Sequence, residues 1–266
     1  MTAHQTRNAL VTGATSGIGL AIVRQLAEEG HRVFLSARTE ADVERTVKEL
    51  RGLGSEGPGL EVDGTAADVR SAEDVTRLVA AATERFGPID VLVNNAGRSG
   101  GGPTATLSDE VWFDVVDTNL HSVFRVTREV LSAGGLAGRP WGRIVNIAST
   151  AGKQGVVLAA PYSASKHGVV GFTKALGLEL ARSGVTVNAV CPGFVETPMA
   201  GRVRQGYAEL WGTTEESVLE TFEAKIPLGR YTTSEEVAGL VGYLVTDAAA
   251  AITAQAINVC GGLGNF

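Results

Sequence analysis

A short apolar segment, a glycine-rich turn and a helical pattern follow one another at the start of the chain. Residues 8–12 (NALVT) form the apolar segment, and the turn that follows has glycine at positions 13, 17 and 19. Glycine permits a tight turn, close approach of a phosphate to backbone N–H groups, and close packing of helix on strand. The positive end of the helix adds an attraction for anions. The order of these elements predicts a dinucleotide site at Gly13, Gly17 and Gly19, although a glycine pattern alone also fits a plain turn.

Six further strand patterns follow, and helical patterns or turns separate them. The predicted strands are residues 8–12, 32–37, 60–67, 89–93, 142–147, 185–190 and 254–259. The predicted helices are residues 20–29, 41–51, 72–86, 109–131, 159–182 and 234–244. This alternation has no compositional break, so it predicts one α/β domain over residues 1–266: a doubly wound Rossmann fold with a seven-stranded parallel sheet and helices on both faces. Residues 196–227 interrupt the alternation, and we expect them to form a lid over the substrate.

Composition limits the class of protein and of partner. Hydrophobic residues make up 44% of the 266 residues, which is enough for a core, and the net charge of −6 disfavours nucleic acid or an anionic membrane as a partner. No apolar run has the length of a membrane span and no signal region is evident, so we expect a cytoplasmic protein. Cys191 and Cys260 are expected to be buried thiols, and the four histidines have no metal-ligand spacing, so no metal site is predicted.

Tyr162 and Lys166 are four residues apart in a predicted helix and therefore share one face. A unit charge about 4 Å from a phenol, at an effective dielectric constant of about 20, is worth roughly three pKa units. The spacing thus predicts that the lysine lowers the pKa of the phenol and makes Tyr162 a proton donor and acceptor near neutral pH. The alternative is a surface tyrosine and a surface lysine on an ordinary helix.

Arg38 directly follows the second predicted strand, where an NAD site would place an acidic residue for the ribose 2′-hydroxyl. An arginine at this position favours the 2′-phosphate of NADP(H). Glu40 is the rival residue, and a solvated arginine is the structural alternative.

Several motifs in one order resemble those of the short-chain dehydrogenase/reductase family. They are residues 12–19, 94–97, 149, 162–166 and 192–193, and the resemblance extends over the whole chain from residue 8. It implies a catalytic set of Asn119, Ser149, Tyr162 and Lys166. Tyr162 would protonate a ketone oxygen while a nicotinamide delivers hydride, and Ser149 would hold that oxygen. Lys166 would bind the nicotinamide ribose, and Asn119 would hold a water.

The same resemblance implies contacts with NADP(H) from three parts of the chain. Asp68 and Val69 would contact the adenine, residues 95–97 the ribose, and residues 192–197 the nicotinamide amide. The implied cofactor-binding residues are Gly13, Thr15, Ser16, Gly17, Ile18, Gly19, Arg38, Asp68, Val69, Asn95, Ala96, Gly97, Tyr162, Lys166, Pro192, Gly193, Val195 and Thr197.

Within this family, residues 146–157, 160–182, 187–199 and 258–266 resemble the ketoreductases of bacterial type II aromatic polyketide synthesis. That resemblance implies reduction of one ketone, the C9 carbonyl, of a poly-β-ketone bound to an acyl carrier protein in antibiotic biosynthesis. It also implies a homotetramer, with which the small residues Ala164, Gly168, Gly171 and Ala175 on one helix are consistent. Ser99 stands where those enzymes carry proline, so the likeness does not extend to the configuration of the alcohol. The loop between residues 52 and 67 is also longer.

A polyketide would need a broad apolar wall. We expect substrate contacts from Ser149, Gln154, Val156, Tyr162, Met199, Tyr207 and Trp211. Alternatively, the aromatic residues of 196–227, Phe222 among them, pack a lid helix on the core without touching substrate. Arg38, Arg70 and Arg98 all lie at carboxyl ends of predicted strands, so they form a candidate cluster for the cofactor phosphate and the phosphopantetheine of the carrier.

Two other functions stay open at this point. The first is the reduction of linear 3-oxoacyl groups on the acyl carrier protein of fatty acid synthesis, which uses the same chemistry on a smaller substrate. The second is a non-catalytic dinucleotide sensor on the same fold. The complete set of Ser149, Tyr162 and Lys166 argues against a sensor, because a protein that only binds needs no reactive phenol.

Overall fold

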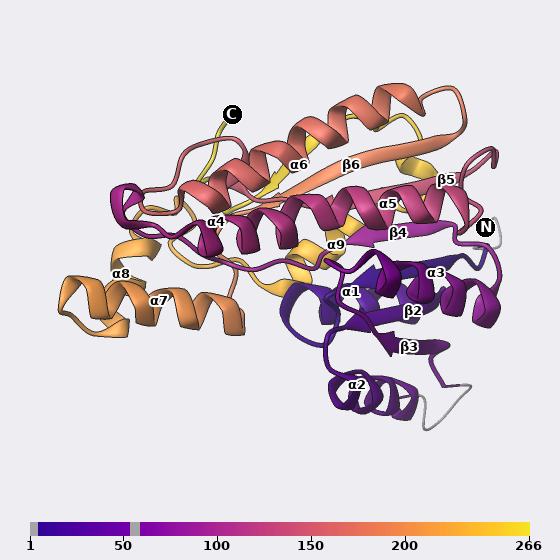
Figure 1. The fold of residues 1–266 in the computed structure, drawn as a ribbon, viewed down its shortest axis with the longest axis horizontal. Coiled ribbons are helices and arrows are strands. Elements are labelled where there is room, and N and C mark those ends of the chain that lie inside the picture. Colours follow the sequence, from indigo (N-terminus) through magenta and orange to yellow (C-terminus); the bar gives the residue numbers. More distant parts are fainter. Residues whose placement is uncertain (1–4, 54–58) are drawn as a thin grey trace.

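The computed structural model describes residues 5–53 and 59–266, so part of the long loop before the third strand lies outside the described residues. Seven parallel strands form one sheet in the order β3-β2-β1-β4-β5-β6-β7 (Figure 1). The strands are β1 Asn8–Thr12, β2 Arg32–Ala37, β3 Val62–Ala66, β4 Val91–Asn94, β5 Gly142–Ile147, β6 Val185–Pro192 and β7 Ala256–Val259. The predicted doubly wound parallel sheet is confirmed.

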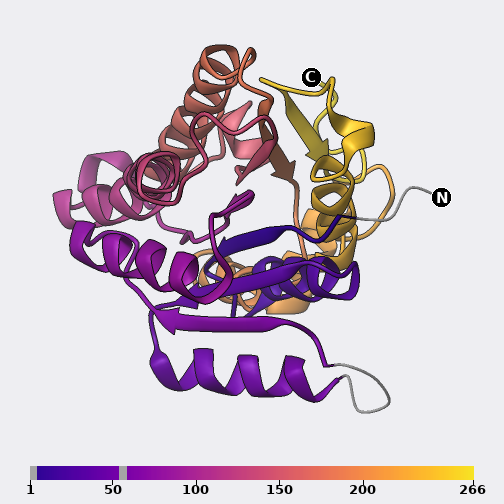
Figure 2. The same ribbon diagram turned by 90° about the vertical axis from the view of Figure 1, so that its right-hand side faces the viewer.

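Helices cover both faces of this sheet (Figure 2). They are α1 Gly17–Glu28, α2 Glu40–Gly52, α3 Ala72–Phe86, α4 Asp109–Val116, α5 Ser122–Ser132, α6 Ala160–Glu179, α7 Pro198–Trp211, α8 Glu215–Glu223 and α9 Ser234–Leu244. Helices α1, α2 and α9 pack on one face, and α3, α5 and α6 pack on the other. Within β1, Ala9 and Val11 face the first group while Leu10 faces the second. Such two-sided burial explains why the central strands β1 and β4 are mostly apolar rather than alternating.

A buried chain of hydrogen bonds joins the middle of the sheet to two helices. The Asn94 side chain on β4 donates to Thr127 Oγ1 on α5 at 2.9 Å and to Asn146 Oδ1 on β5 at 2.8 Å. Asn146 in turn donates to Thr173 Oγ1 on α6 at 2.9 Å. Because a buried polar group without a partner costs about 1–3 kcal/mol, this chain fixes how α5 and α6 sit on the strands.

Residues 196–227, predicted to form a lid over the substrate, contain α7 and α8, which lie together at one end of the molecule (Figure 1). The buried side chain of Arg204 on α7 joins three parts of this region. It forms a bidentate ion pair with Glu196, bonds Glu215 at the start of α8, and lies over the ring of Tyr231. The segment of residues 196–227 is thus stabilised by buried ion pairs of Arg204 as well as by apolar packing.

The predicted helix over residues 109–131 is interrupted. A π-helical turn, η2 Asp117–His121, separates α4 from α5 and contains the buried Asn119. Wide turns of this kind occur often at functional sites. Among residues 5–53 and 59–266, no helix combines the length and apolarity needed to cross a bilayer.

Candidate active site

The glycine turn after β1 is locked to the end of β4. Thr12 Oγ1 accepts hydrogen bonds from the backbone N–H groups of Asn95 and Ala96, both at 3.1 Å. The Asn95 side chain donates to the carbonyls of Thr12 and Gly13. Gly13 has φ +64°, and a Cβ there would lie 2.7 Å from Ala96 Cα, so this position requires glycine. Strand order reverses between β1 and β4, which is where open α/β sheets bind ligands.

The first turn of α1 has the features of a phosphate cradle. Ser16, its N-cap residue, makes no side-chain capping bond, and the first turn contains no acidic residue. Gly17 has φ +52°, and a Cβ there would lie 3.1 Å from the Thr197 methyl group. At Gly19 a Cβ would lie 2.4 Å from both the Asn95 amide nitrogen and the Gly13 carbonyl, so this glycine packs on the turn rather than on a strand. These residues fit a pyrophosphate bound by backbone N–H groups.

The side chains of Arg38 and Glu40 differ in whether they form hydrogen bonds or ion pairs. Among the described residues, no hydrogen bond or ion pair holds the exposed Arg38 side chain. Glu40 Oε2, in contrast, accepts the backbone N–H of Ala66 at 3.0 Å. Arg38, next to β2, is thus a cation without an ion-pair partner within the described part of the chain, whereas the rival carboxylate of Glu40 already accepts a hydrogen bond.

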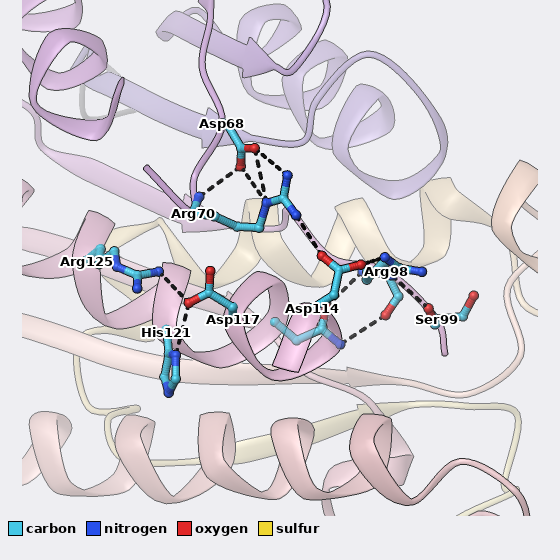
Figure 3. A network of polar contacts seen from close by, with 9 residues as sticks. Asp68, Arg70, Arg98, Ser99, Asp114, Asp117, His121 and Arg125 are labelled. Atoms are coloured by element: carbon cyan, nitrogen blue, oxygen red, sulfur yellow. Dashed lines mark hydrogen bonds and ion pairs between the residues drawn. The ribbon is translucent and has the colours of Figure 1, made fainter. Parts of the chain in front are cut away.

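The other two strand-end arginines are paired with carboxylates (Figure 3). Arg70 bonds Asp68 with its Nε and Nη2 groups and Asp114 on α4 with its Nη1 at 2.6 Å. Arg98 pairs with the second oxygen of Asp114. The hydrogen bond from Arg70 also lowers the pKa of the Asp68 carboxyl. The structure therefore brings Arg70 and Arg98 of the predicted cluster together at Asp114, a carboxylate that no sequence signal marked, and both cations are paired.

Ser149 and Tyr162 meet at the carboxyl edge of the sheet. Ser149 follows β5 and caps the short helix η3 Thr150–Gly152 by accepting the Ala151 N–H at 3.1 Å. Tyr162 lies in the first turn of α6, where its hydroxyl group interacts with Ser149, and Ser149 Oγ also donates to the Pro192 carbonyl at 3.5 Å. A ketone oxygen bound between these two hydroxyl groups would have two donors.

Lys166 does not act on Tyr162 in the predicted way. Burial raises the pKa of Tyr162, and the hydrogen bond with Ser149 only partly offsets this effect. Lys166 Nζ donates to the Ile147 carbonyl at 2.8 Å and lies 5.7 Å from the centre of the Tyr162 ring. Burial lowers the pKa of Lys166 to about 8. The expected depression of the phenol pKa is wrong here, since loss of solvent outweighs a lysine whose amine is directed to a carbonyl.

Asn119 joins the loop after β4 to α6. Its Oδ1 accepts the Arg98 N–H at 2.8 Å, while its Nδ2 donates to the Arg98 carbonyl and to Ser165 Oγ. A Cβ on Gly97 would lie 3.3 Å from Asn119 Oδ1 and 3.7 Å from Lys166 Nζ. The structure therefore brings Asn119, Lys166 and Gly97 together, with the Asn119 amide engaged by the main chain of Arg98.

The loop after β6 completes this edge. Val195 forms a bridge with Thr232, and Thr197 caps α7 by accepting the Ala200 N–H at 3.2 Å. Pro192 ends β6, and a Cβ on Gly193 would lie 2.9 Å from Cys260 Cβ. Cys191 and Cys260 are both buried and free, as predicted.

Besides Ser149 and Tyr162, five residues are expected to contact substrate, and they lie in two segments. Gln154 and Val156 lie in the loop after η3, and Met199, Tyr207 and Trp211 lie on α7. Tyr207 Oη links the segments by donating to the Val157 carbonyl at 3.0 Å. Phe222 is buried against Phe194 and so packs the lid, as the alternative interpretation held, whereas 46% of the Trp211 surface stays exposed.

The lowered pKa of Lys166 predicts a pH-dependent stability in Lys166→Met. The pKa of Lys166 in the folded protein lies below the usual lysine value of 10.5, so the unfolded chain binds more protons between pH 8 and 10.5. The contribution of this group to wild-type stability therefore rises with pH over that range. Lys166→Met loses this term, so its stability relative to wild type should fall by up to about 3 kcal/mol between pH 7 and pH 10. Urea unfolding at both pH values measures the change. Lys174→Met, on the exposed side of the same helix, should show no such trend; equal behaviour of the two variants would contradict the assignment.

Comparisons with known proteins agree with this arrangement. The short-chain dehydrogenase profile matches residues 7–208. A ketoacyl reductase assigned to the monensin polyketide synthase of Streptomyces virginiae is 69% identical over the full length of both chains. A crystallised variant of actinorhodin polyketide ketoreductase with NADPH is 62% identical, with a TM-score of 0.94 over both complete chains.

A more distant relative, the 3-oxoacyl-acyl-carrier-protein reductase of Pseudomonas aeruginosa, is 38% identical over 97% of this chain and 98% of its own. The profile match, the identities and the geometry of the carboxyl edge all lead to one conclusion. This chain is an enzyme of the short-chain dehydrogenase family.

Proposed function

We propose that the protein is an NADPH-dependent ketoreductase that reduces one ketone, the C9 carbonyl, of a poly-β-ketone bound to an acyl carrier protein in aromatic polyketide antibiotic biosynthesis. The observation that carries the proposal is the pair of hydroxyl groups, Ser149 and Tyr162, beside an uncapped helix N-terminus and an unpaired Arg38. Support for the substrate class comes from the monensin and actinorhodin relatives, which match over their full length.

The described residues fit a phosphorylated dinucleotide. Backbone N–H groups at Ser16, Gly17 and Ile18 would hold the pyrophosphate, and Arg38 would hold the 2′-phosphate. Lys166 is still largely protonated at pH 7 and would donate to a ribose hydroxyl. When bound, the reduced nicotinamide supplies the hydride.

Arg38 carries the choice between NADPH and NADH. Arg38→Glu should lower kcat/KM for NADPH by about 10- to 100-fold and leave kcat/KM for NADH within about threefold, because only NADPH carries the 2′-phosphate. Steady-state rates with both cofactors test this. Glu40→Gln is the control and should keep the preference of wild type, since Glu40 bonds the Ala66 amide. Loss of NADPH preference in Glu40→Gln alone would contradict the assignment.

Tyr162 acts as the proton donor and Ser149 as its partner. Its raised pKa keeps the phenol protonated at neutral pH, which is the state required to donate. A ketone that accepts hydride becomes an alkoxide, a stronger base than a phenolate, so the proton moves from Tyr162 Oη to the substrate oxygen. Ser149 holds that oxygen in place. Asn119 and Lys166 both lie close to Gly97, and a water held by Asn119 would return the proton through Lys166.

Tyr162→Phe should lower kcat by about 10²–10⁴-fold, the range typical of a lost general acid. Because the substitution removes only the hydroxyl, the Kd of NADPH should stay within about threefold, as measured by fluorescence titration. Tyr243→Phe, at an exposed position of α9, is the matched control and should retain wild-type turnover. Normal turnover in Tyr162→Phe would contradict the proposed role.

The Arg98–Asp114 pair is the proposed contact of the carrier's phosphopantetheine. Arg98 is half exposed and shares Asp114 with Arg70, which also pairs with Asp68, so the two cations face two carboxylates (Figure 3). Arg98 is the more exposed of the two cations and would exchange Asp114 for a phosphate. We also propose that the protein is a homotetramer. Of the small residues on α6 that are consistent with this assembly, Gly171 and Ala175 are exposed, whereas Gly168 packs on Leu120.

Arg98→Glu should raise KM for a carrier-bound ketone at least tenfold and KM for free trans-1-decalone less than twofold, since only the former brings a phosphate. Asp114→Asn should change KM for the carrier-bound ketone in the opposite direction, because it removes the competing carboxylate. Kinetics with both substrates at low salt test the pair. Equal effects on both substrates would rule out this contact.

Substrate preference distinguishes a polyketide ketoreductase from the alternative, a 3-oxoacyl-acyl-carrier-protein reductase of fatty acid synthesis. Relatives of that class are 38% to 41% identical, below the 69% of the monensin relative, and this difference favours the polyketide substrate. Relative rates on trans-1-decalone and on acetoacetyl thioesters distinguish the two functions. NADPH oxidation with either ketone would exclude a sensor.

A further inference from the structure

Helix α7 buries one charged side chain and little apolar surface. Of its 14 residues, Arg204 and Ala208 are the buried ones, while Ala200 and Tyr207 pack partly against the apolar cluster around Phe222. A surface helix usually packs through a broad apolar stripe, and a buried alanine removes little apolar surface from water. The placement of α7 therefore depends strongly on the polar contacts of Arg204, whose side chain is 10% exposed.

The Arg204 guanidinium has three partners, and each belongs to a different segment. Its Nη1 and Nη2 donate to the two carboxylate oxygens of Glu196 at 2.8 and 3.0 Å, and its Nε donates to Glu215 Oε1 at 3.0 Å. The guanidinium carbon lies 5.5 Å from the ring centre of Tyr231. A bidentate pair fixes direction as well as distance. Arg204 thus fixes α7 relative to the loop after β6, to α8 and to the segment at Tyr231.

Main-chain bonds hold the loop after β6 independently of Arg204. The Glu196 N–H donates to the Thr232 carbonyl at 3.1 Å, and the Thr232 N–H donates to the Phe194 carbonyl at 2.9 Å. Neither bond involves a side chain of α7. Loss of the Arg204 guanidinium would therefore release the helix and leave in place the loop, whose residues 192–197 are expected to contact the nicotinamide.

Three of the residues expected to contact substrate, Met199, Tyr207 and Trp211, lie on α7. They can form one wall of a substrate site only while the helix stays docked. We propose that Arg204 is a positioning residue that holds α7 beside the active site and so sets the affinity for the ketone without changing the affinity for the cofactor. This inference rests on the function proposed above.

The test compares the same substitution at two arginines of α7. Arg202 is exposed and forms no hydrogen bond or ion pair with the residues that the structure describes. With saturating NADPH, Arg204→Met should raise KM for trans-1-decalone by about tenfold or more, because removal of one partner breaks a buried ion pair. The Kd of NADPH should stay within about threefold. Arg202→Met should leave both constants within about twofold of wild type.

The pattern of kinetic constants separates this role from a general loss of folded protein. A smaller folded fraction lowers the apparent kcat and leaves KM unchanged, since the remaining molecules bind normally. An unchanged KM for the ketone in Arg204→Met would overturn the proposal, and so would a Kd of NADPH that rises as much as this KM. Arg204→Lys keeps the charge but not the bidentate geometry, so its KM should lie between those of wild type and Arg204→Met.

Two milder variants keep the proposal testable if Arg204→Met folds poorly. Glu196→Gln removes the bidentate pair and Glu215→Gln removes the bond to α8, and each leaves Arg204 one carboxylate. Both should raise KM for trans-1-decalone, Glu196→Gln the more strongly because it loses two of the three bonds. In a protein that already carries Arg204→Lys, each should have a smaller effect than in wild type. Strictly additive effects would overturn the proposal.

Hydrogen exchange gives a readout that needs no turnover. The amides of residues 202–208 should exchange about tenfold faster or more in Arg204→Met and at the wild-type rate in Arg202→Met. The Thr232 amide, which is bonded to the Phe194 carbonyl, should keep its wild-type rate in both variants. Unchanged exchange in α7, or equal acceleration at Thr232, would overturn the proposal. Wild-type protein that reduces no ketone would instead refute the proposed function, and the exchange data would still decide whether Arg204 holds α7.

Discussion

The contact between the glycine turn of β1 and the end of β4 is the constraint on which the rest of the site depends. Asn95 donates two hydrogen bonds to Thr12 across the point where strand order reverses. This contact aligns the N-terminus of α1 with the loop that carries Gly97 and Arg98. From there Asn119 extends the connection to Ser165 on α6, one residue before Lys166. The proposed cofactor cradle and the helix that carries Tyr162 are therefore parts of one hydrogen-bonded unit.

Burial and pairing, rather than residue type alone, set the charges around this unit. Tyr162 keeps its proton because burial disfavours the phenolate, and Lys166 titrates near 8 for the same reason. At the other end of the site Asp114 shares its two oxygens between Arg70 and Arg98. Arg38 remains unpaired among the described residues, which makes it the cation suited to a 2′-phosphate.

The regular part of the fold was largely predictable. Strands buried on both faces have continuous apolar patterns, and β1, β2 and β5 begin and end where these patterns predict. Helices α7 and α8 were not predicted, because their packing depends on the buried Arg204 and on Phe222, whose partners lie elsewhere in the chain. The π-helical turn at Asn119 also escaped prediction, since a single wide turn leaves the helical periodicity almost unchanged.

By itself the sequence determined the parallel α/β architecture, the glycine turn and the identity of the residues at the strand ends, because each follows from local pattern and from the rule that parallel strands end at one edge. Tertiary structure alone decided that Asp114 pairs with two of the three arginines and that Lys166 faces a carbonyl. These features arise between residues 16 to 44 positions apart, where direction and burial rather than spacing determine the interaction.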